Sequence, residues 1–234
     1  MAASACLLSL SACGFGSYTG ASDQGRSIFD LYKVLWYFAI PVAVIVYGLI
    51  LWSVLRYRKR RDDDDLPKQT RYSVPLEITY TVIPVFMVAA IFAFTYHTEQ
   101  EVDRVVPRPA VIVNVDAFQW QWRFTYPQHD VTVVGTPGNP PTLVLPAGET
   151  TRIVLRADDV DHALYVPAFL FQRQAIPGVV NVFDFTVPRP GRWPGQCSLY
   201  CGLDHTSMTF AVQALSPSAF DQWLAGHTAS GAGT

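Results

Sequence analysis

The sequence predicts a two-helix transmembrane hairpin followed by an all-β Greek-key sandwich or barrel, and three observations support this. Half of the 234 residues are hydrophobic and only 15% are charged, with a mean hydropathy of +0.19 and a net charge of −2. The apolar excess is concentrated in two uncharged runs within the first hundred residues. The remainder consists of short segments rich in Val, Thr and aromatic residues, separated by Pro and Gly. So few charges exclude a disordered chain and a nucleic-acid-binding protein.

Each uncharged run is long enough to cross a bilayer as a helix. Residues 34–55 form a run of 22 and residues 78–96 a run of 19. A helix of the first length spans roughly 33 Å, about the thickness of the hydrocarbon core. We therefore predict helices over about 29–56 and 76–97, within an N-terminal hairpin of residues 13–98. A pair of buried core helices is the alternative, but the basic connection between the runs favours a membrane hairpin.

The connection between the two runs predicts the orientation of the hairpin. Seven of the 17 basic residues lie between Arg56 and Arg71. Positively charged loops stay in the cytoplasm, so both chain termini are expected on the outer side of a bacterial plasma membrane. The acidic residues at 62–65 offset part of this charge but count little in that rule.

The N-terminus carries a possible lipoprotein signal. The string LSAC at residues 10–13 follows a short apolar stretch and is typical of a bacterial lipoprotein cleavage box. This pattern predicts a signal over residues 1–12 and lipidation of Cys13 on the outer side. A chance cysteine in an uncleaved leader is the alternative, and Cys6 has no predicted role.

From residue 107 to about residue 225 the pattern predicts an extracytoplasmic β domain. Pro- and Gly-rich strings separate the predicted strands, and their spacing is typical of an antiparallel sandwich or barrel. The string SPSAFDQWLA predicts a short helix over 216–225, with a serine cap and a proline in its first turn. Residues 226–234 are expected to form a disordered tail. The predicted strands are 111–117, 120–126, 131–134, 142–145, 151–156, 181–187 and 208–214.

A cluster of cysteine, histidine and methionine is the main chemical signal. Cys197, Cys201, His205 and Met208 fall within 12 residues, and His162 lies 35 positions before the first cysteine. Soft sulfur together with imidazole favours copper, since an isolated zinc site rarely recruits methionine. Two thiolates this close can bridge two copper ions. A disulfide between the cysteines is the alternative in an external domain, but it leaves the histidine and methionine unexplained.

These residues resemble subunit II of the haem-copper terminal oxidases. The string C-x-x-x-C-x-x-x-H-x-x-M, starting at Cys197, matches the dinuclear copper (CuA) loop of that family at every ligand position. Residues 159–167 resemble its D-V-x-H-x-x-x-V-P segment, residues 117–124 its aromatic Q-W-x-W box, and residues 76–84 the start of its second membrane helix. The resemblance covers residues 35–223 and implies a cupredoxin-like outer domain.

The resemblance also implies a set of copper ligands. Two copper ions would share the sulfurs of Cys197 and Cys201. One ion would be completed by two further side chains, and the other by a side chain and a backbone carbonyl. The implied ligands are His162 and Met208 for the first ion, and His205 and the backbone carbonyl of Leu199 for the second.

Two further residues match family positions with roles. Trp120 matches the residue through which electrons from cytochrome c are thought to enter, whereas a core or interface aromatic is the plain alternative. Trp122, two positions along the predicted strand, is expected to pack in the core. Glu77 matches a carboxylate at the cytoplasmic mouth of a proton path. A carboxylate at a helix start also interacts favourably with the helix dipole, so both interpretations stay open.

One departure from the family pattern concerns magnesium. Many members have a glutamate between the two cysteines, and its side chain helps to hold a magnesium ion at the subunit interface. This chain has Leu199 there, and a leucine side chain cannot bind a hard cation. We therefore expect no magnesium ligand from this chain.

The resemblance implies the electron-accepting subunit of a respiratory cytochrome c oxidase. Electrons would pass from cytochrome c to CuA and then to haem in subunit I, where oxygen is reduced to water and protons are pumped. Two alternatives remain: the CuA subunit of a nitric oxide reductase, and a membrane-tethered cupredoxin that carries electrons alone. A quinol-oxidase subunit is disfavoured because all five side-chain ligands are present. Residues 97–234 hold eight Arg, no Lys and twelve acidic residues, a formal charge of −4 that favours a basic cytochrome c.

Overall fold

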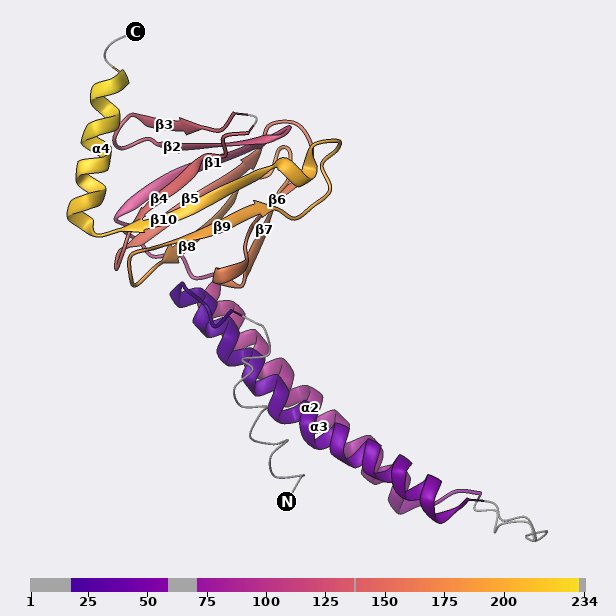
Figure 1. The fold of residues 1–234 in the computed structure, drawn as a ribbon. Helices are drawn as coiled ribbons and strands as arrows, with labels where there is room; N and C mark the ends of the chain where they lie inside the picture. The colour runs from indigo at the N-terminus through magenta and orange to yellow at the C-terminus, as the bar shows by residue number, and fades with distance from the viewer. Residues whose placement is uncertain (1–17, 59–70, 137, 232–234) are drawn as a thin grey trace, which may run out of the picture. The chain divides into compact units, whose positions relative to one another are not determined.

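The computed structural model describes residues 18–58, 71–136 and 138–231. Within these ranges the chain divides into two compact units. One unit contains the globular β domain together with the segment that ends at Phe29. The other unit is Asp30–Gln100, which contains most of two long helices. Figure 1 shows the elements of both units.

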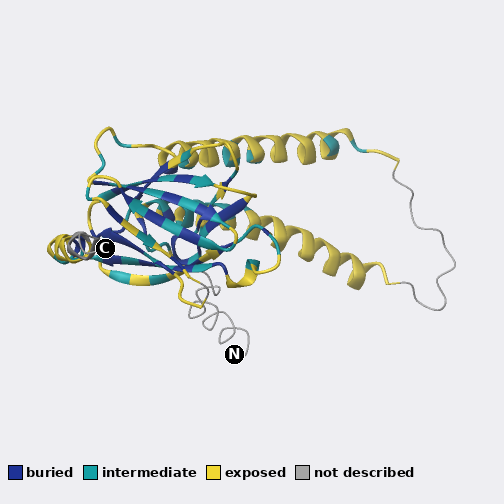
Figure 2. Ribbon diagram, turned by 90° about the horizontal axis from the view of Figure 1, so that it is seen from above, coloured by how far each residue is buried: buried dark blue, intermediate teal, exposed yellow. Residues whose placement is uncertain are grey.

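The two long helices are α2 (Asp23–Arg56) and α3 (Val74–Val102). Both are apolar enough to cross a membrane, and most of their residues are exposed, as the yellow colouring in Figure 2 shows. Apolar side chains in water are unfavourable, so this exposure fits helices surrounded by lipid or by a partner's helices. Each helix extends beyond its predicted bounds because polar end residues continue the backbone hydrogen bonding outside the apolar run. The rings of Phe38 and Phe94 lie 6.5 Å apart.

The β domain consists of two five-stranded sheets. Their strand orders are β3-β2-β1-β5-β8 and β4-β10-β9-β6-β7. The strands are β1 (Val111–Phe118), β2 (Gln121–Tyr126), β3 (Val131–Val134), β4 (Thr142–Pro146), β5 (Thr150–Ala157), β6 (His162–Val166), β7 (Phe171–Ala175), β8 (Asn181–Thr186), β9 (Gly191–Cys197) and β10 (Thr209–Leu215). The sandwich prediction is confirmed, but the expectation of purely antiparallel pairing is wrong. The β1–β5 and β10–β4 pairs are parallel.

Three strands are absent from the sequence prediction, and each has a local reason. The polar sequence of β7 (FQRQA) lacks a β-branched residue, and β7 lies at a sheet edge. The sequence of β9 (GRWPGQC) holds one proline and two glycines, which ordinarily mark turns. The short β6 (HALYV) directly follows a polar, acidic loop. Pairing between these strands supplies the stability that their local sequences do not predict.

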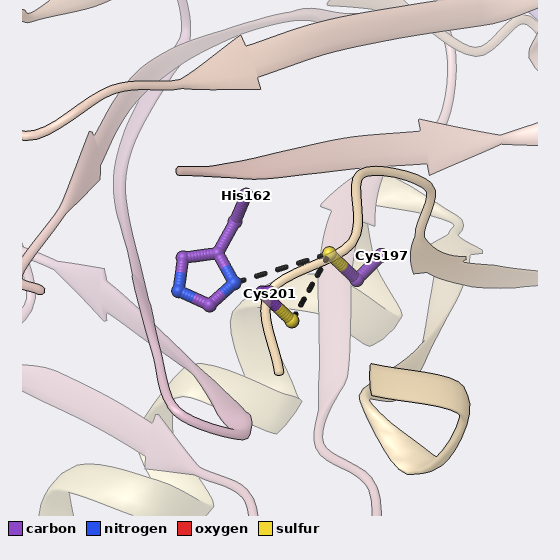
Figure 3. A group of neighbouring side chains, drawn as sticks. All are labelled: His162, Cys197 and Cys201. Carbon is purple, nitrogen blue, oxygen red and sulfur yellow. Dashed lines mark hydrogen bonds between the residues drawn. The ribbon is translucent and has the colours of Figure 1, made fainter. Parts of the chain in front are cut away.

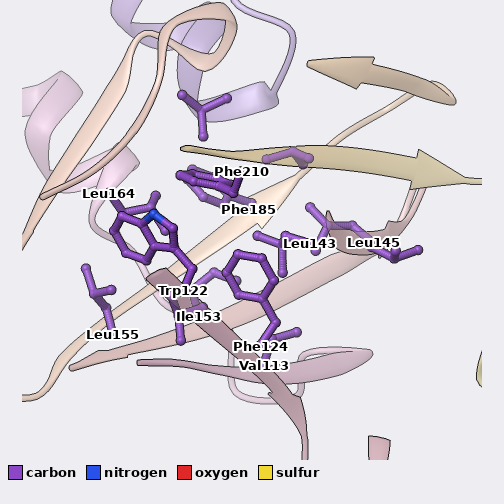
Figure 4. Packing of buried hydrophobic residues seen from close by; sticks show 14 of the residues in the cluster. Val113, Trp122, Phe124, Leu143, Leu145, Ile153, Leu155, Leu164, Phe185 and Phe210 are labelled. Atoms are coloured by element: carbon purple, nitrogen blue, oxygen red, sulfur yellow. The ribbon is translucent and has the colours of Figure 1, made fainter. Parts of the chain in front are cut away.

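The core lies between the two sheets, as Figure 4 shows. Alternation along β2 places Trp122, Phe124 and Tyr126 inside, where all three are fully buried. This confirms the prediction for Trp122. The hydroxyl of Tyr126 donates to the backbone carbonyl of Val144 and accepts from its N–H, both at 2.8 Å, so burial of this phenol leaves no polar group unpaired.

The C-terminal helix α4 (Pro217–Gly231) is longer than predicted. The hydroxyl of Ser216 accepts the Ala219 N–H at 3.4 Å, as a cap does, and Phe220 is buried against the sandwich. The helix continues to Gly231, past its predicted end at residue 225, and residues 232–234 of the expected tail lie outside the described residues. The centroid of the His227 ring lies 4.5 Å from that of the Trp223 ring, with the rings tilted by 38°, and its Nδ1 donates to the Trp223 carbonyl at 2.8 Å.

Candidate metal centre

Paired strands and one loop position the predicted copper ligands. His162 begins β6 and Cys197 ends β9, and these two strands are antiparallel neighbours, with Leu164 opposite Cys197. Cys201 lies in the following loop. His205 opens the short 3₁₀ helix η2 (His205–Ser207), and the next residue, Met208, precedes β10. The second sheet therefore brings a histidine 35 positions upstream to the cysteine loop.

The donor atoms of these residues converge, as Figure 3 shows for His162, Cys197 and Cys201. The two sulfur atoms lie 3.9 Å apart, and Nδ1 of His162 lies 3.9 Å from the Cys197 sulfur. The sulfur of Cys201 is 3.5 Å from Nδ1 of His205 and 3.8 Å from the sulfur of Met208. The Cys197 sulfur also lies 3.2 Å from the carbonyl oxygen of Leu199. All six predicted ligands are thus gathered at one place.

The spacing and chemistry of these donors fit a metal better than a disulfide. Both thiols are free, and 3.9 Å is about twice an S–S bond of roughly 2.05 Å. It is less than two metal–sulfur bonds of about 2.3 Å, so one ion can contact both sulfurs. Thiolates, imidazoles and a thioether form a soft set that suits copper. His162 and Met208 are fully buried and both cysteines are 4% exposed, so water has little access.

The pKa values of the two thiols are shifted in opposite directions. Burial raises the pKa of a thiol, but in Cys197 hydrogen bonds to His162, Ala163 and Leu199 outweigh burial and lower the pKa below its usual value. Burial and the charge of a Cys197 thiolate both raise the pKa of Cys201. The pair therefore holds one thiolate and one thiol unless a cation supplies compensating charge. Both cysteines reach the thiolate form when a metal ion lies between them.

Asp159 is a functional residue that sequence reasoning missed. Its Oδ1 lies 2.9 Å from Nε2 of His162, so it can hold a proton on Nε2 when Nδ1 binds a metal. Burial opposes ionisation of Asp159, but hydrogen bonds from His162, Gln119 and Val160 lower its pKa. Burial likewise lowers the pKa of His162, and its bonds to Cys197 and Asp159 raise it overall. The signal available in the sequence was the Asp–x–x–His spacing.

Trp120 lies beside the ligand loop, whereas Trp122 is a core residue. The half-buried Trp120 donates from Nε1 to the carbonyl oxygen of Cys201 at 3.2 Å. Trp122 is fully buried, with its Nε1 3.5 Å from the Met208 carbonyl. Gln119, which the sequence did not single out, donates its side-chain amide to the same Cys201 carbonyl at 2.7 Å.

The remaining predicted residues are not among the donors of this cluster. Glu77 is in the first turn of α3, where its carboxylate accepts the Ser73 N–H at 3.3 Å. That contact is a helix-capping interaction, as the dipole interpretation expected. Cys13 and the predicted signal at residues 1–12 lie outside the described residues, as does most of the basic connection between the helices.

Two apolar helices that could span a membrane, followed by a cupredoxin-like sandwich with a soft donor cluster, define a class of membrane-anchored redox subunit. The family described as "Cytochrome C oxidase subunit II, periplasmic domain" matches residues 139–215. The chain is 35% identical to "Probable cytochrome c oxidase subunit 2" of Streptomyces avermitilis, over 89% of this chain and 77% of that protein. A relative with the same description in Streptomyces coelicolor is 34% identical, with the same coverage. The chain belongs to the cytochrome c oxidase subunit 2 family.

A solved structure supports the fold of the outer domain. The crystal structure of the periplasmic domain of subunit II of cytochrome oxidase (CoxB) of Bradyrhizobium japonicum superimposes with a TM-score of 0.50. It is 26% identical in sequence, and the match covers 54% of this chain and 99% of that one. The β-sandwich identified in the present chain is therefore a family fold.

Proposed function

We propose that the chain is the electron-accepting subunit of a respiratory cytochrome c oxidase. It receives electrons from cytochrome c at a dinuclear copper centre and passes them to haem in subunit I, where oxygen is reduced to water and protons are pumped. The observation that carries this proposal is the convergence of two thiols, two imidazoles, a thioether and a carbonyl oxygen at one end of the sandwich.

The residues of the chain hold the metal and limit its movement. The bound copper pair supplies one-electron redox chemistry. Cys197 and Cys201 would hold both ions, with His162 and Met208 as further ligands of one ion and His205 and the Leu199 carbonyl as further ligands of the other. His162 lies in β6 and Cys197 in β9, and Met208 directly precedes β10, so the sheet limits the movement of these ligands as the charge changes. The burial of His162, Met208 and both cysteines limits the rearrangement of water around the site.

The remaining roles belong to the assembled oxidase. Trp120 accepts electrons from cytochrome c, and its bond to the Cys201 carbonyl supports this role. Glu77 lies at the cytoplasmic mouth of a proton path, in addition to capping α3. The positive connection keeps the loop between the helices cytoplasmic and both termini outside. Lipidation of Cys13 adds a second membrane anchor.

Copper content and electron paramagnetic resonance (EPR) of the purified full-length subunit test the proposal. We expect two copper ions per chain and a seven-line pattern, because one unpaired electron is shared equally by two copper nuclei. A four-line mononuclear pattern, or no bound copper, would contradict it. Zinc-loaded protein is the control, since zinc has no unpaired electron.

Co-purification separates the three candidate functions. An oxidase or a nitric oxide reductase subunit purifies with a haem-containing membrane partner, and the gas consumed then separates those two. A lone tethered cupredoxin purifies without haem. Metal analysis of the same complex checks the magnesium expectation, and magnesium bound by this subunit would contradict it.

A further inference from the structure

The turn between β1 and β2 lies between the two segments that carry the copper ligands. Phe118 pairs with Gln121, so Gln119 and Trp120 form the turn itself. The backbone N–H of Gln119 donates to Oδ2 of Asp159 at 2.7 Å. Its side-chain amide donates to the carbonyl oxygen of Cys201, also at 2.7 Å. One exposed glutamine thus contacts both ligand-bearing segments.

The contacts of Gln119 continue directly into two predicted ligands. The other oxygen of Asp159 accepts the proton of His162, which is fully buried. On the opposite side the Cys201 carbonyl belongs to a ligand residue. A chain of hydrogen bonds therefore runs from His162 through Asp159 and Gln119 to Cys201, and no link in it is a metal bond.

The Cys201 carbonyl accepts two donors, and Gln119 makes the shorter bond. The Trp120 indole reaches this oxygen at 3.2 Å, against 2.7 Å for the Gln119 amide. The Trp120 indole is half-buried and makes one long hydrogen bond to this oxygen, so water competes with it as a donor to the Cys201 carbonyl. The neighbouring amide, anchored through its own backbone by Asp159, holds the carbonyl where the indole can reach it.

Gly202 shows how closely these groups pack. Its φ of +122° lies in a region that favours glycine. A Cβ on Gly202 would lie 3.1 Å from the Gln119 amide nitrogen and 3.2 Å from the Trp120 indole nitrogen. The absence of a side chain at this position permits both donors to approach the Cys201 carbonyl.

We infer that Gln119 is a positioning residue for electron acceptance: it holds the Trp120 indole against the Cys201 peptide and so fixes the contact between the surface aromatic and the copper ligands. This inference rests on the proposed function. Gln119 is not a ligand and moves no proton. It acts on the rate at which an electron passes from Trp120 to the metal, not on metal binding.

The test is Gln119→Ala in the purified oxidase complex, with electron transfer from reduced cytochrome c followed by stopped flow. The substitution removes the amide but keeps the backbone bond to Asp159. We expect about a tenfold fall in the rate at saturating cytochrome c. This is the low end of the effect of removing a group that hydrogen-bonds to a metal ligand. KM, copper content and the EPR pattern stay unchanged. Gln222→Ala, the same chemical change at an exposed position of α4, is the matched control and keeps the wild-type rate.

Gln119→Glu is the second variant, because it preserves size and places an acceptor oxygen against the Cys201 carbonyl. It is expected to slow the same step at least as much as alanine. A wild-type rate in both variants would overturn the inference. Loss of copper or of the dinuclear pattern together with the rate would also overturn it, because Gln119 would then merely maintain the site. Failure of the proposed function is separate, since the wild-type complex itself would then lack the seven-line pattern.

Discussion

At the scale of single residues, the sulfur atoms of Cys197 and Cys201 each have their own set of neighbours. Cys197 lies near His162 and the Leu199 carbonyl, and Cys201 lies near His205 and Met208. Neither sulfur has enough other donor atoms near it to supply the ligands of two metal ions. The dinuclear proposal therefore depends on both sulfurs being shared.

Replacing Cys201 with serine tests this sharing. Cys201→Ser removes one bridging sulfur while keeping nearly the same volume, and a hydroxyl is a poor ligand for soft copper. We expect a domain that folds and binds a single copper, with a four-line EPR pattern. Retention of two coppers and of the seven-line pattern would contradict the bridging role.

Asp116 provides a prediction about pH. Burial and the charge of Asp158 raise the pKa of Asp116, and Arg123 and Arg156 only partly oppose this. The raised pKa means that Asp116 binds its proton more tightly in the folded state than in the unfolded state. Its contribution to the free energy of unfolding is therefore fully present below the ordinary pKa of aspartate, and it is lost as the pH rises through the folded-state pKa. Asp116→Asn is expected to raise stability at pH 7 by up to about 0.5 kcal/mol.

That gain is expected to shrink toward zero as the pH is lowered to about 4, near the ordinary pKa of aspartate. Thermal unfolding of both forms at several pH values measures it. A gain that grows on acidification would show that the Arg123 ion pair, at 3.6 Å, outweighs the cost of burying the charge.

At the scale of elements, the start of α2 is attached to the β domain. The Ala21 N–H donates to the Ala168 carbonyl at 2.8 Å, and the Gln24 side chain accepts the Thr186 N–H at 3.2 Å. Gly25 is buried against the 3₁₀ helix η1 (Pro167–Phe169), where a Cβ would lie 2.4 Å from the Phe169 carbonyl oxygen. The first residues of α2 therefore pack against the β domain within the same compact unit.

A pair of glycine variants in one helix tests this attachment. Gly25→Ala forces a Cβ into a backbone carbonyl and is expected to destabilise the domain by about 1–3 kcal/mol, as overpacking does. Gly48→Ala, also in α2, meets nothing within 4 Å and serves as the control. It is expected to be neutral or stabilising, because alanine favours helix. Equal unfolding temperatures for the two variants would refute the close-packing argument.

At the scale of the whole molecule, acidic residues gather near the metal site. Asp158, Asp161 and Asp204 flank the predicted ligands in sequence, and all three are exposed. Among the described residues, Asp158 forms an ion pair with Arg123 at 3.4 Å. The outer segment as a whole is acidic, with eight Arg against twelve acidic residues. Such a surface attracts a basic protein over distances of about 10 Å at 0.1 M salt.

The association of soluble cytochrome c with the oxidase should therefore depend on salt. We expect the second-order rate constant to fall by about tenfold or more between low and physiological ionic strength. The rate at saturating cytochrome c, which reports transfer within the complex, should stay constant. A second-order rate constant that is flat across ionic strength would remove the support for electrostatic attraction.

Much of this architecture could be predicted from local sequence. The apolar runs predicted both long helices, and seven of the ten strands were expected close to their observed bounds. The strands that were missed, β6, β7 and β9, have polar or turn-forming sequences and exist because neighbouring strands pair with them. The structure continues α4 past residue 225, where the sequence predicted a tail, and His227 contacts Trp223 one turn earlier in this helix.

Local sequence was enough to predict the two long apolar helices, the β character of the outer domain and the soft character of the site. Composition and the spacing of Cys197, Cys201, His205 and Met208 are local properties. The contact of His162 with Cys197, and that of Gln119 with the Cys201 carbonyl 82 positions away in the chain, arise from the fold. The physical reason is that such contacts depend on the order and register of strands in the two sheets, which no local pattern specifies.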